Sequence, residues 1–249
     1  MALETRQRLY CTAPLCQDAE VTLDRDQSHY LLNVLRKAEG DELLLFNGKD
    51  GEWQAEITQA AKKAAVLHCL AATRPQDPVP SLMLVFAPIK KARIDFIAEK
   101  ATELGVGILQ PVMTDRTQMS RVNTDRMRAN AIEAAEQTGR TTIPEIRAPI
   151  SLTALLEDWP ATRHIIFCDE DRAASPDHAM ADVVAGLTGK AAIFIGPEGG
   201  FSPRERDHII AQAQAHAVAL GRNILRADTA MLAALAIWQS AAGEWKGRR

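Results

Sequence analysis

The stretch "AAIFIGPEGGFSPRE", residues 191–205, runs from an apolar segment through a glycine-rich turn into the start of a helix. Its first five residues have the length and character of a buried strand. Pro203 follows Ser202 at the position that prolines favour in the first turn of a helix. A strand, a glycine turn and a helix in this order are typical of α/β proteins, whose ligands bind beyond the carboxyl ends of the strands.

The same alternation extends outward from this stretch. Short apolar runs occupy residues 82–87, 107–113, 164–170 and 217–221. Helical patterns cover residues 93–105, 124–140, 202–214 and 229–245, and Thr124 is predicted to be an N-cap. Alternating helices and unbroken apolar strands predict a buried parallel sheet with helices on both faces.

Residues 20–72 have a different pattern. Strands are predicted at residues 21–24, 41–60 and 64–70, with a hairpin turn at "NGKDGE", residues 47–52. A helix is predicted over residues 29–41, ending at Gly40. Residues 73–81 contain three prolines and predict a stiff linker. We therefore expect a small, mostly β domain over residues 1–72 and an α/β domain over residues 82–249.

The composition is typical of a soluble globular protein: 249 residues, 47% hydrophobic, 24% charged, with a net charge of −3. No apolar run approaches the roughly 20 residues of a membrane helix, and no secretory signal is visible, so a cytoplasmic protein is expected. Residues 1–72 carry eight Lys or Arg and eleven Asp or Glu, and residues 73–249 carry twenty-one of each. A nucleic-acid site must therefore be a local basic patch.

The four cysteines, Cys11, Cys16, Cys69 and Cys168, form no CxxC pair. A zinc site built from Cys11, Cys16, His68 and Cys69 lacks a second closely spaced pair, so we expect reduced thiols and no metal.

The glycine turn at residues 196–200 does not fit the usual phosphate-binding motifs. No Gly-Lys-Ser/Thr follows it, it is not a GxGxxG fingerprint, and Glu198 would repel a phosphate. A glycine loop that bears an acid suits a ligand with a cationic or hydroxyl-bearing part, although a tight turn with a solvated glutamate fits it equally well. A second unusual segment, "LGRNILRADTA" at residues 220–230, follows the next strand. Two such loops can converge on one ligand, and S-adenosylmethionine meets their chemistry.

These two loops together resemble the C-terminal signature of the SPOUT methyltransferases, and in particular the RsmE family of bacterial 16S ribosomal RNA uridine-N3 methyltransferases. Residues 91–106 and 134–146 resemble further blocks of that family, and residues 29–57 resemble its N-terminal PUA-like RNA-binding domain. The second loop departs from the usual sequence of the family at Arg222, Asn223, Ala227 and Asp228.

The resemblance implies an α/β SPOUT domain with a C-terminal trefoil knot, preceded by a small PUA-like β-barrel. It also implies a homodimer, for which the apolar positions Met231, Leu232, Leu235 and Trp238 of the last helix are candidates, with ordinary core packing as the alternative. The implied S-adenosylmethionine site comprises the following residues: Ile195, Gly196, Pro197, Glu198, Gly199, Gly200, Leu220, Gly221, Asn223, Ile224, Leu225, Thr229 and Ala230. Asp169, Glu170 and Asp171 end a predicted strand and form either an exposed acidic turn or part of the cofactor side.

Methylation at uridine N3 requires removal of a weakly acidic proton and stabilisation of the resulting anion. Glu198 and Asp228 are the acids of the two loops and Arg226 is the nearest arginine, so these three are the catalytic candidates. The basic candidates for contacts with 16S ribosomal RNA or the small ribosomal subunit are Arg6, Arg8, Arg36, Lys37, Lys90, Lys91, Arg93, Arg116, Arg121 and Arg140.

Three other functions stay open at this point. The chain resembles SPOUT enzymes closely enough that 2′-O-ribose or guanine-N1 methylation is an alternative. A catalytically idle RNA-binding or ribosome assembly factor is a second, although it would not need the three glycines of the first loop. A nucleotide-binding oxidoreductase is a third, which the missing GxGxxG disfavours.

Overall fold

A computed structural model describes residues 7–61, 64–89, 91–119, 121–172 and 178–246 of the chain. The chain divides into two compact units. The first comprises Met1–Pro78 and Ala135–Ile143, and the second comprises Val79–Ala134 and Pro144–Arg249. A segment from the middle of the chain therefore belongs to the N-terminal unit.

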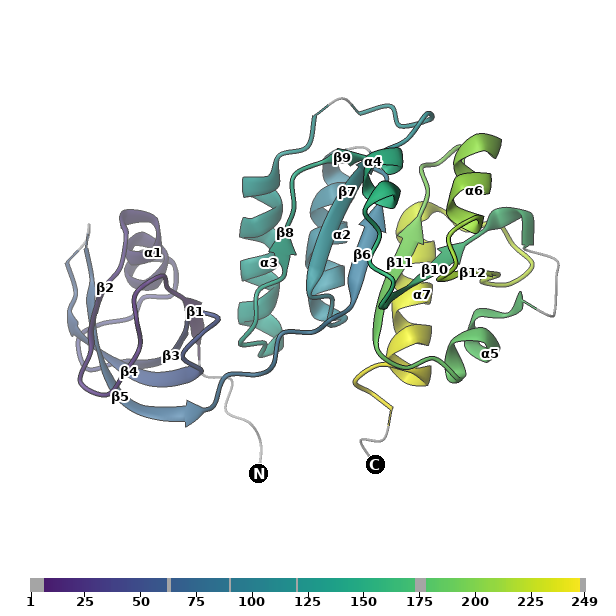
Figure 1. Ribbon diagram of the computed structural model, residues 1–249. Coiled ribbons are helices and arrows are strands. Elements are labelled where there is room, and N and C mark those ends of the chain that lie inside the picture. The colour runs from purple at the N-terminus through teal and green to yellow at the C-terminus, as the bar shows by residue number, and fades with distance from the viewer. Residues whose placement is uncertain (1–6, 62–63, 90, 120, 173–177, 247–249) are drawn as a thin grey trace. The chain divides into compact units, whose positions relative to one another are not determined.

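The first unit is a curled five-stranded sheet (Figure 1). Its strand order is β1-β3-β4-β5-β2, in which only the β1–β3 pair is parallel. The strands are β1 Arg8–Tyr10, β2 Glu20–Thr22, β3 Glu42–Phe46, β4 Glu52–Gln59 and β5 Val66–Arg74. Alternate residues such as Leu43, Leu45 and Ile57 are fully buried, so one face of the sheet forms the core of this unit.

Two predictions for the first unit are wrong in their bounds. Asp24 does not end a strand: its side chain accepts a hydrogen bond from the backbone N–H of Gln27 and caps helix α1, Arg25–His29. The helix continues as a π-helical turn, Tyr30–Val34, and does not reach Gly40. It ends because Arg36 takes up a left-handed conformation with φ of 56°, which turns the chain away from the helix axis.

The second unit is built on a seven-stranded sheet. Its main order is β12-β10-β11-β6-β7-β8, with β9 paired to β7, and every strand pairing in it is parallel. The strands are β6 Met83–Phe86, β7 Ile108–Met113, β8 Glu145–Ile146, β9 Ile150–Ser151, β10 Arg163–Cys168, β11 Lys190–Ile195 and β12 Ala215–Val218. The predicted parallel sheet is confirmed.

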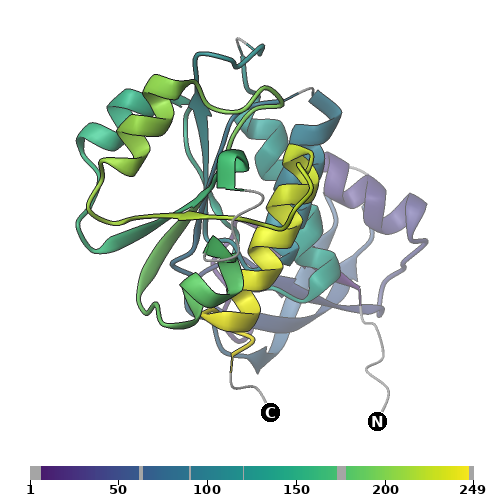
Figure 2. The same ribbon diagram turned by 90° about the vertical axis from the view of Figure 1, so that its right-hand side faces the viewer.

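Helices cover both faces of this sheet (Figure 2). Leu84 and Ile193 point to the face covered by α2, Lys91–Glu103, α3, Thr124–Thr138, α5, Met180–Ala185, and α7, Ala227–Ala241. Their neighbours Val85 and Phe194 point to the other face, covered by α4, Leu152–Glu157, and α6, Pro203–Ile210. Because the central strands β6 and β11 are buried on both faces, their apolar runs are unbroken rather than alternating.

Three helices of this unit, α6, α3 and α7, bear on the sequence predictions. Helix α6 begins as expected at Pro203, and Ser202 and Glu205 form a reciprocal capping box. The predicted N-cap at Thr124 is wrong, since Asn123 Oδ1 accepts the hydrogen bond from the N–H of Arg126. Helix α7 buries Met231, Leu235 and Trp238 in the core of this unit, and Leu232 packs against the same core.

Candidate functional site

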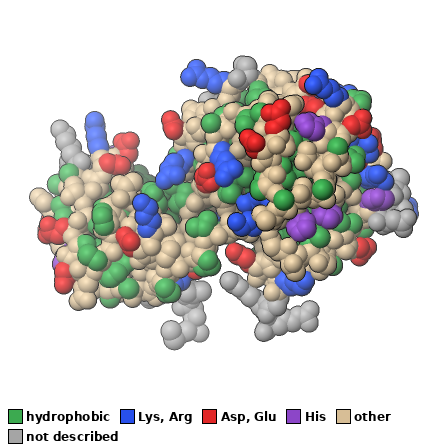
Figure 3. Space-filling view, in the orientation of Figure 1, with side chains coloured by type: hydrophobic (Ala, Val, Ile, Leu, Met, Phe, Trp, Pro, Cys, Tyr) green, Lys and Arg blue, Asp and Glu red, His purple; other side chains and the backbone are tan. Residues whose placement is uncertain are grey.

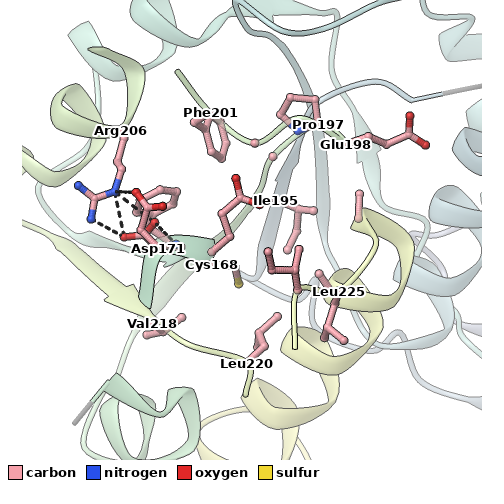
Figure 4. Close-up of a pocket in the computed structure, with 18 of the residues that line it drawn as sticks. Cys168, Asp171, Ile195, Pro197, Glu198, Phe201, Arg206, Val218, Leu220 and Leu225 are labelled. Carbon is pink, nitrogen blue, oxygen red and sulfur yellow. Dashed lines mark hydrogen bonds and ion pairs between the residues drawn. The ribbon is translucent and has the colours of Figure 1, made fainter. Parts of the chain in front are cut away.

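A pocket of about 460 Å³ lies at the carboxyl ends of three adjacent strands of the second unit (Figure 4). Strand β10 pairs with β11 on one side and with β12 on the other, so the segments that follow these strands meet at one edge. This is where ligands bind in open α/β sheets, and the volume is in the range of small-molecule sites.

The first wall of the pocket is the glycine loop that follows β11. Gly200 has φ of 69°, a conformation that L-residues with a side chain rarely adopt, and its N–H donates to the carbonyl of Pro197 at 2.9 Å. A Cβ at Gly200 would also overlap the carboxylate of Glu170. At Gly196 a Cβ would lie 3.0 Å from the ring of Phe201. The backbone angle therefore favours glycine at position 200, and a side chain at position 196 would force the Phe201 ring to shift.

The second wall is the segment between β12 and α7. Leu220, Gly221, Asn223, Ile224 and Leu225 all line the pocket. Ile224 is largely open to solvent, with 74% of the residue exposed. The two loops that were predicted to converge do so.

Two of the predicted cofactor residues do not line the pocket. Gly199 instead accepts a hydrogen bond through its carbonyl from Nη1 of Arg116, at 2.5 Å. Thr229 is exposed on α7, and its N–H is bonded to Oδ1 of Asp228. The other eleven predicted residues are lining residues: Ile195, Gly196, Pro197, Glu198, Gly200, Leu220, Gly221, Asn223, Ile224, Leu225 and Ala230.

The third wall is the segment that follows β10, for which the sequence left an exposed acidic turn and a place on the cofactor side as alternatives. Cys168, Asp169, Glu170 and Asp171 all line the pocket. Asp169 is only 4% exposed and pairs with Arg206 of α6 at 2.8 Å, so it is not part of an exposed acidic turn. The acidic residues at a strand end were a signal, but the strand order that puts β10 between the two loops is not visible in the sequence.

The floor and one side of the pocket are apolar. Phe167, Val218 and Phe201 contribute to it, and the Phe167 and Phe201 rings meet edge to face with centroids 5.5 Å apart. Burial raises the pKa of the Cys168 thiol to about 12, so this cysteine is neutral and acts as an apolar lining group. Apolar surface with a few polar groups suits a planar organic ligand.

The three catalytic candidates lie in two groups: Arg226 by itself, and Glu198 together with Asp228. Arg226 is the N-cap residue of α7, and its exposed side chain lines the pocket. Glu198 and Asp228 are joined by Arg93 of α2, whose Nη1 lies 3.6 Å from the Glu198 carboxylate and 3.4 Å from that of Asp228. In Figure 4 the Glu198 side chain points away from Cys168 and Val218.

The basic residues predicted to contact RNA are not equally available. Arg36, Arg116 and Arg121 are exposed, and Lys37 and Arg140 are half-buried. Arg93 is engaged by the two carboxylates described above. Arg6 and Lys90 lie outside the described residues, and Lys91 begins α2. On the face that Figure 3 shows, basic and acidic side chains are interspersed.

Arg8 has a structural position within the first unit. It is 9% exposed, its Nε is 2.7 Å from the Glu52 carboxylate, and its guanidinium lies 4.4 Å from the centre of the Phe46 ring. Its Nη1 donates to the carbonyl of Ala135 at 2.6 Å, and its Nη2 to that of Arg140 at 2.8 Å. Since these partners occupy the guanidinium, Arg8 is not free to bind an RNA phosphate.

Two further properties concern the described residues as a whole. They contain no group of three or more His, Cys, Asp or Glu arranged to hold a metal ion. Every helix among them is too short or too polar to cross a bilayer.

The fold and the pocket together define an α/β domain with a pocket at the carboxyl edge of its parallel sheet. The sequence matches the family described as RNA methyltransferase domain over residues 75–239, and the one described as RNA methyltransferase PUA domain over residues 23–68. The class of protein is thus an RNA methyltransferase with a PUA domain.

Individual relatives make the family more specific. Proteins named ribosomal RNA small subunit methyltransferase E from Synechocystis sp. and Rickettsia conorii are 32% and 29% identical to this chain. The match to the Synechocystis protein covers 88% of this chain and 72% of that protein. The match to the Rickettsia protein covers 92% of this chain and 93% of that protein. The chain belongs to the ribosomal RNA small subunit methyltransferase E family.

Two solved structures are similar over nearly the whole chain. The enzyme of this name from Neisseria gonorrhoeae, bound to S-adenosylmethionine, has a TM-score of 0.82 and 29% identity, covering 94% of this chain and 97% of its own. A putative methyltransferase from Legionella pneumophila, also with bound S-adenosylmethionine, has a TM-score of 0.84 and 26% identity. The match covers 96% of this chain and 99% of that protein's chain.

Proposed function

We propose that this protein transfers the methyl group of S-adenosylmethionine to N3 of a uridine in the 16S RNA of the small ribosomal subunit. One observation carries the proposal: the glycine loop after β11 and the segment before α7 converge on one pocket at the carboxyl edge of the sheet. Solved members of the fold family hold S-adenosylmethionine. The proposed substrate implies action in the cytoplasm.

The residues present suit that cofactor. Gly196 and Gly200 allow the backbone to approach a ligand closely, and Ile195, Leu220 and Leu225 supply apolar surface for its adenine. When bound, the cofactor supplies an activated methyl group. The proposal includes the trefoil knot through residues 220–230, closure of the N-terminal sheet into a barrel, and a homodimer.

The chain's own residues would handle the substrate proton and charge. Arg226 is exposed at the pocket, which supports a role for its guanidinium in stabilising the negative charge that develops on the uridine oxygens. Glu198 and Asp228 are candidates for the proton acceptor, and Arg93 holds both carboxylates at one place. The exposed Arg36, Arg116 and Arg121, with Lys37, are the candidates for phosphate contacts.

The decisive experiment is mass spectrometry of 16S ribosomal RNA nucleosides from cells with and without the gene. We expect 3-methyluridine to disappear on deletion and to return when the wild-type gene is supplied. An unchanged level of 3-methyluridine would mean that the base or the RNA is wrong. Loss of a different methylated nucleoside would identify the alternative reaction.

The catalytic roles are tested with Arg226→Ala, Glu198→Gln and Asp228→Asn in single-turnover methylation of the RNA. We expect Arg226→Ala to lower the rate about a hundredfold or more, the usual effect of removing one group that stabilises transition-state charge. A wild-type rate for Arg226→Ala would remove this arginine from the mechanism. Comparing the two acid variants decides which of them takes the proton.

A further inference from the structure

The pocket has an excess of negative charge. Its lining includes five carboxylates and three guanidinium groups: Asp169, Glu170, Asp171, Glu198, Asp207 and Arg116, Arg206, Arg226. A pocket with such a lining favours a cationic ligand over an anionic one.

Four of the five carboxylates have a cationic neighbour. Arg206 lies 2.8 Å from Asp169 and 3.2 Å from Asp171, and the charge of Asp207 also acts on it. Glu198 lies 3.6 Å from Arg93. These acids are therefore partly neutralised by the protein itself.

Glu170 is different from the other four. Within the described residues its side chain makes no hydrogen bond and no ion pair. It belongs to the short helical turn Glu170–Arg172 that follows β10, between the segments after β11 and β12. A Cβ added to Gly200 would collide with its carboxylate, so this carboxylate lies directly against the glycine loop.

We propose that Glu170 is a cofactor-binding residue whose carboxylate recognises a cationic group of S-adenosylmethionine, either the sulfonium or the α-ammonium. The inference rests on the proposed function. It deepens that function by assigning a specific recognition role to the third segment of the pocket. An uncompensated carboxylate attracts a cation more strongly once the bound ligand has displaced water from around it.

The test is calorimetric titration of wild-type protein and Glu170→Gln with S-adenosylmethionine, S-adenosylhomocysteine and adenosine. We expect Glu170→Gln to raise the Kd for S-adenosylmethionine about three- to tenfold, the range for loss of a partly desolvated ion pair. Adenosine has neither cation, so its Kd should not change. Glu170→Asp, which keeps the charge, should retain part of the affinity.

The three ligands separate the two cationic groups. S-adenosylhomocysteine lacks the sulfonium but keeps the α-ammonium. Equal weakening of both cofactor forms assigns Glu170 to the α-ammonium, and weakening of S-adenosylmethionine alone assigns it to the sulfonium. The matched control is Glu157→Gln on α4, an exposed residue outside the pocket that undergoes the same chemical change.

Two results would overturn the inference: an unchanged Kd for S-adenosylmethionine in Glu170→Gln, or an equal loss of adenosine binding, which would indicate a distorted pocket. Melting temperatures of the variants, measured without ligand, identify any loss of folding. If the wild-type protein binds none of the three ligands, the proposed function fails. If it binds them and Glu170→Gln binds equally well, only the role of Glu170 fails.

Discussion

At Gly200 two constraints act on one residue. Its φ of 69° lies in the left-handed region, and the space where a side chain would start is occupied by the Glu170 carboxylate. Asp169, in the neighbouring segment, has a different constraint, since a side chain that is 2% exposed carries a charge that Arg206 compensates. The shape of the pocket thus depends on single residues for steric reasons in one wall and for electrostatic reasons in another.

Gly200→Ala tests the steric constraint. We expect the left-handed backbone to cost about 1–2 kcal/mol and the displaced loop to weaken S-adenosylmethionine binding by about tenfold or more. The control is Gly186→Ala, at the end of α5, where a Cβ meets nothing within 4 Å and φ is −92°. Calorimetry and thermal melts of both variants provide the measurement, and equal effects would contradict the argument.

Arg206→Ala tests the electrostatic constraint. Removing the guanidinium leaves the buried Asp169 carboxylate with the backbone N–H of Asp171, at 3.3 Å, and the more distant guanidinium of Arg172, at 3.8 Å. We therefore expect a loss of about 2 kcal/mol in the free energy of unfolding. Arg204→Ala, an exposed arginine on the same helix, should change it by less than about 0.5 kcal/mol. Urea denaturation distinguishes the two. A loss as small as that of Arg204→Ala would mean that solvent reaches Asp169.

At the scale of elements, the site depends on which strands are neighbours. Strand β10 lies between β11 and β12 in the sheet, although it precedes both of them in the chain. On the same pair of strands, His164 of β10 and His216 of β12 face each other, with ring nitrogens 3.1 Å apart. Burial and the neighbouring His164 lower the pKa of His216 below its ordinary value of 6.5.

This histidine pair predicts a pH dependence of stability. Below pH 6.5 and above the lowered pKa, the unfolded chain binds a proton that the folded chain does not, so the free energy of unfolding falls as the pH falls through this window. In His216→Gln this part of the pH dependence should disappear. Urea denaturation at several pH values between 5 and 8 measures it. His208→Gln on α6 controls for the loss of an imidazole, and identical profiles for wild type and His216→Gln would refute the assignment.

At the scale of the whole molecule, the chain contributes to its first unit twice. Residues 135–143 join Met1–Pro78, and Arg8 bonds to the carbonyls of Ala135 and Arg140 in that segment. Gln76 and Asp77 reach Thr141 in the same way, with the N–H of Asp77 donating to Thr141 Oγ1 at 3.1 Å. The first unit is therefore incomplete without residues that follow it by more than fifty positions.

A fragment of residues 1–78 should consequently be less stable than the same sheet in the intact chain. It lacks the carbonyls that accept the hydrogen bonds of Arg8, and buried charged donors without acceptors are costly. Arg8→Met in the intact chain removes the donor and its charge while keeping much of the volume. We expect it to be destabilising because the buried Glu52 carboxylate then loses its nearest cation, at 2.7 Å, and keeps the Arg74 guanidinium at 3.7 Å and the Thr73 hydroxyl at 3.1 Å. Circular dichroism melts of the fragment, the variant and the wild type measure this, and a fragment that melts like the intact protein would disprove it.

Local patterns in the sequence were sufficient for the longer strands and helices of the second unit and for two walls of the pocket, but β1, β8, β9, α4 and α5 were not predicted. Unbroken apolar runs predicted the buried strands, because a strand in a parallel sheet is covered on both faces. Glycine spacing predicted the loop after β11, and Gly200 has the left-handed backbone angle that favours glycine. Helix boundaries were less predictable where a side-chain cap such as Asp24 or Asn123 competed with the apolar pattern.

The sequence by itself therefore determined the class of fold, the longer strands and helices of the second unit and the two loops that converge. The tertiary structure alone decided that β10 lies between those loops, that Arg93 joins Glu198 to Asp228, and that Arg8 is buried among backbone carbonyls. The physical reason is the range of the interactions involved. Periodicity and backbone preference act between near neighbours in the chain, whereas ion pairs and strand order join residues that are tens of positions apart.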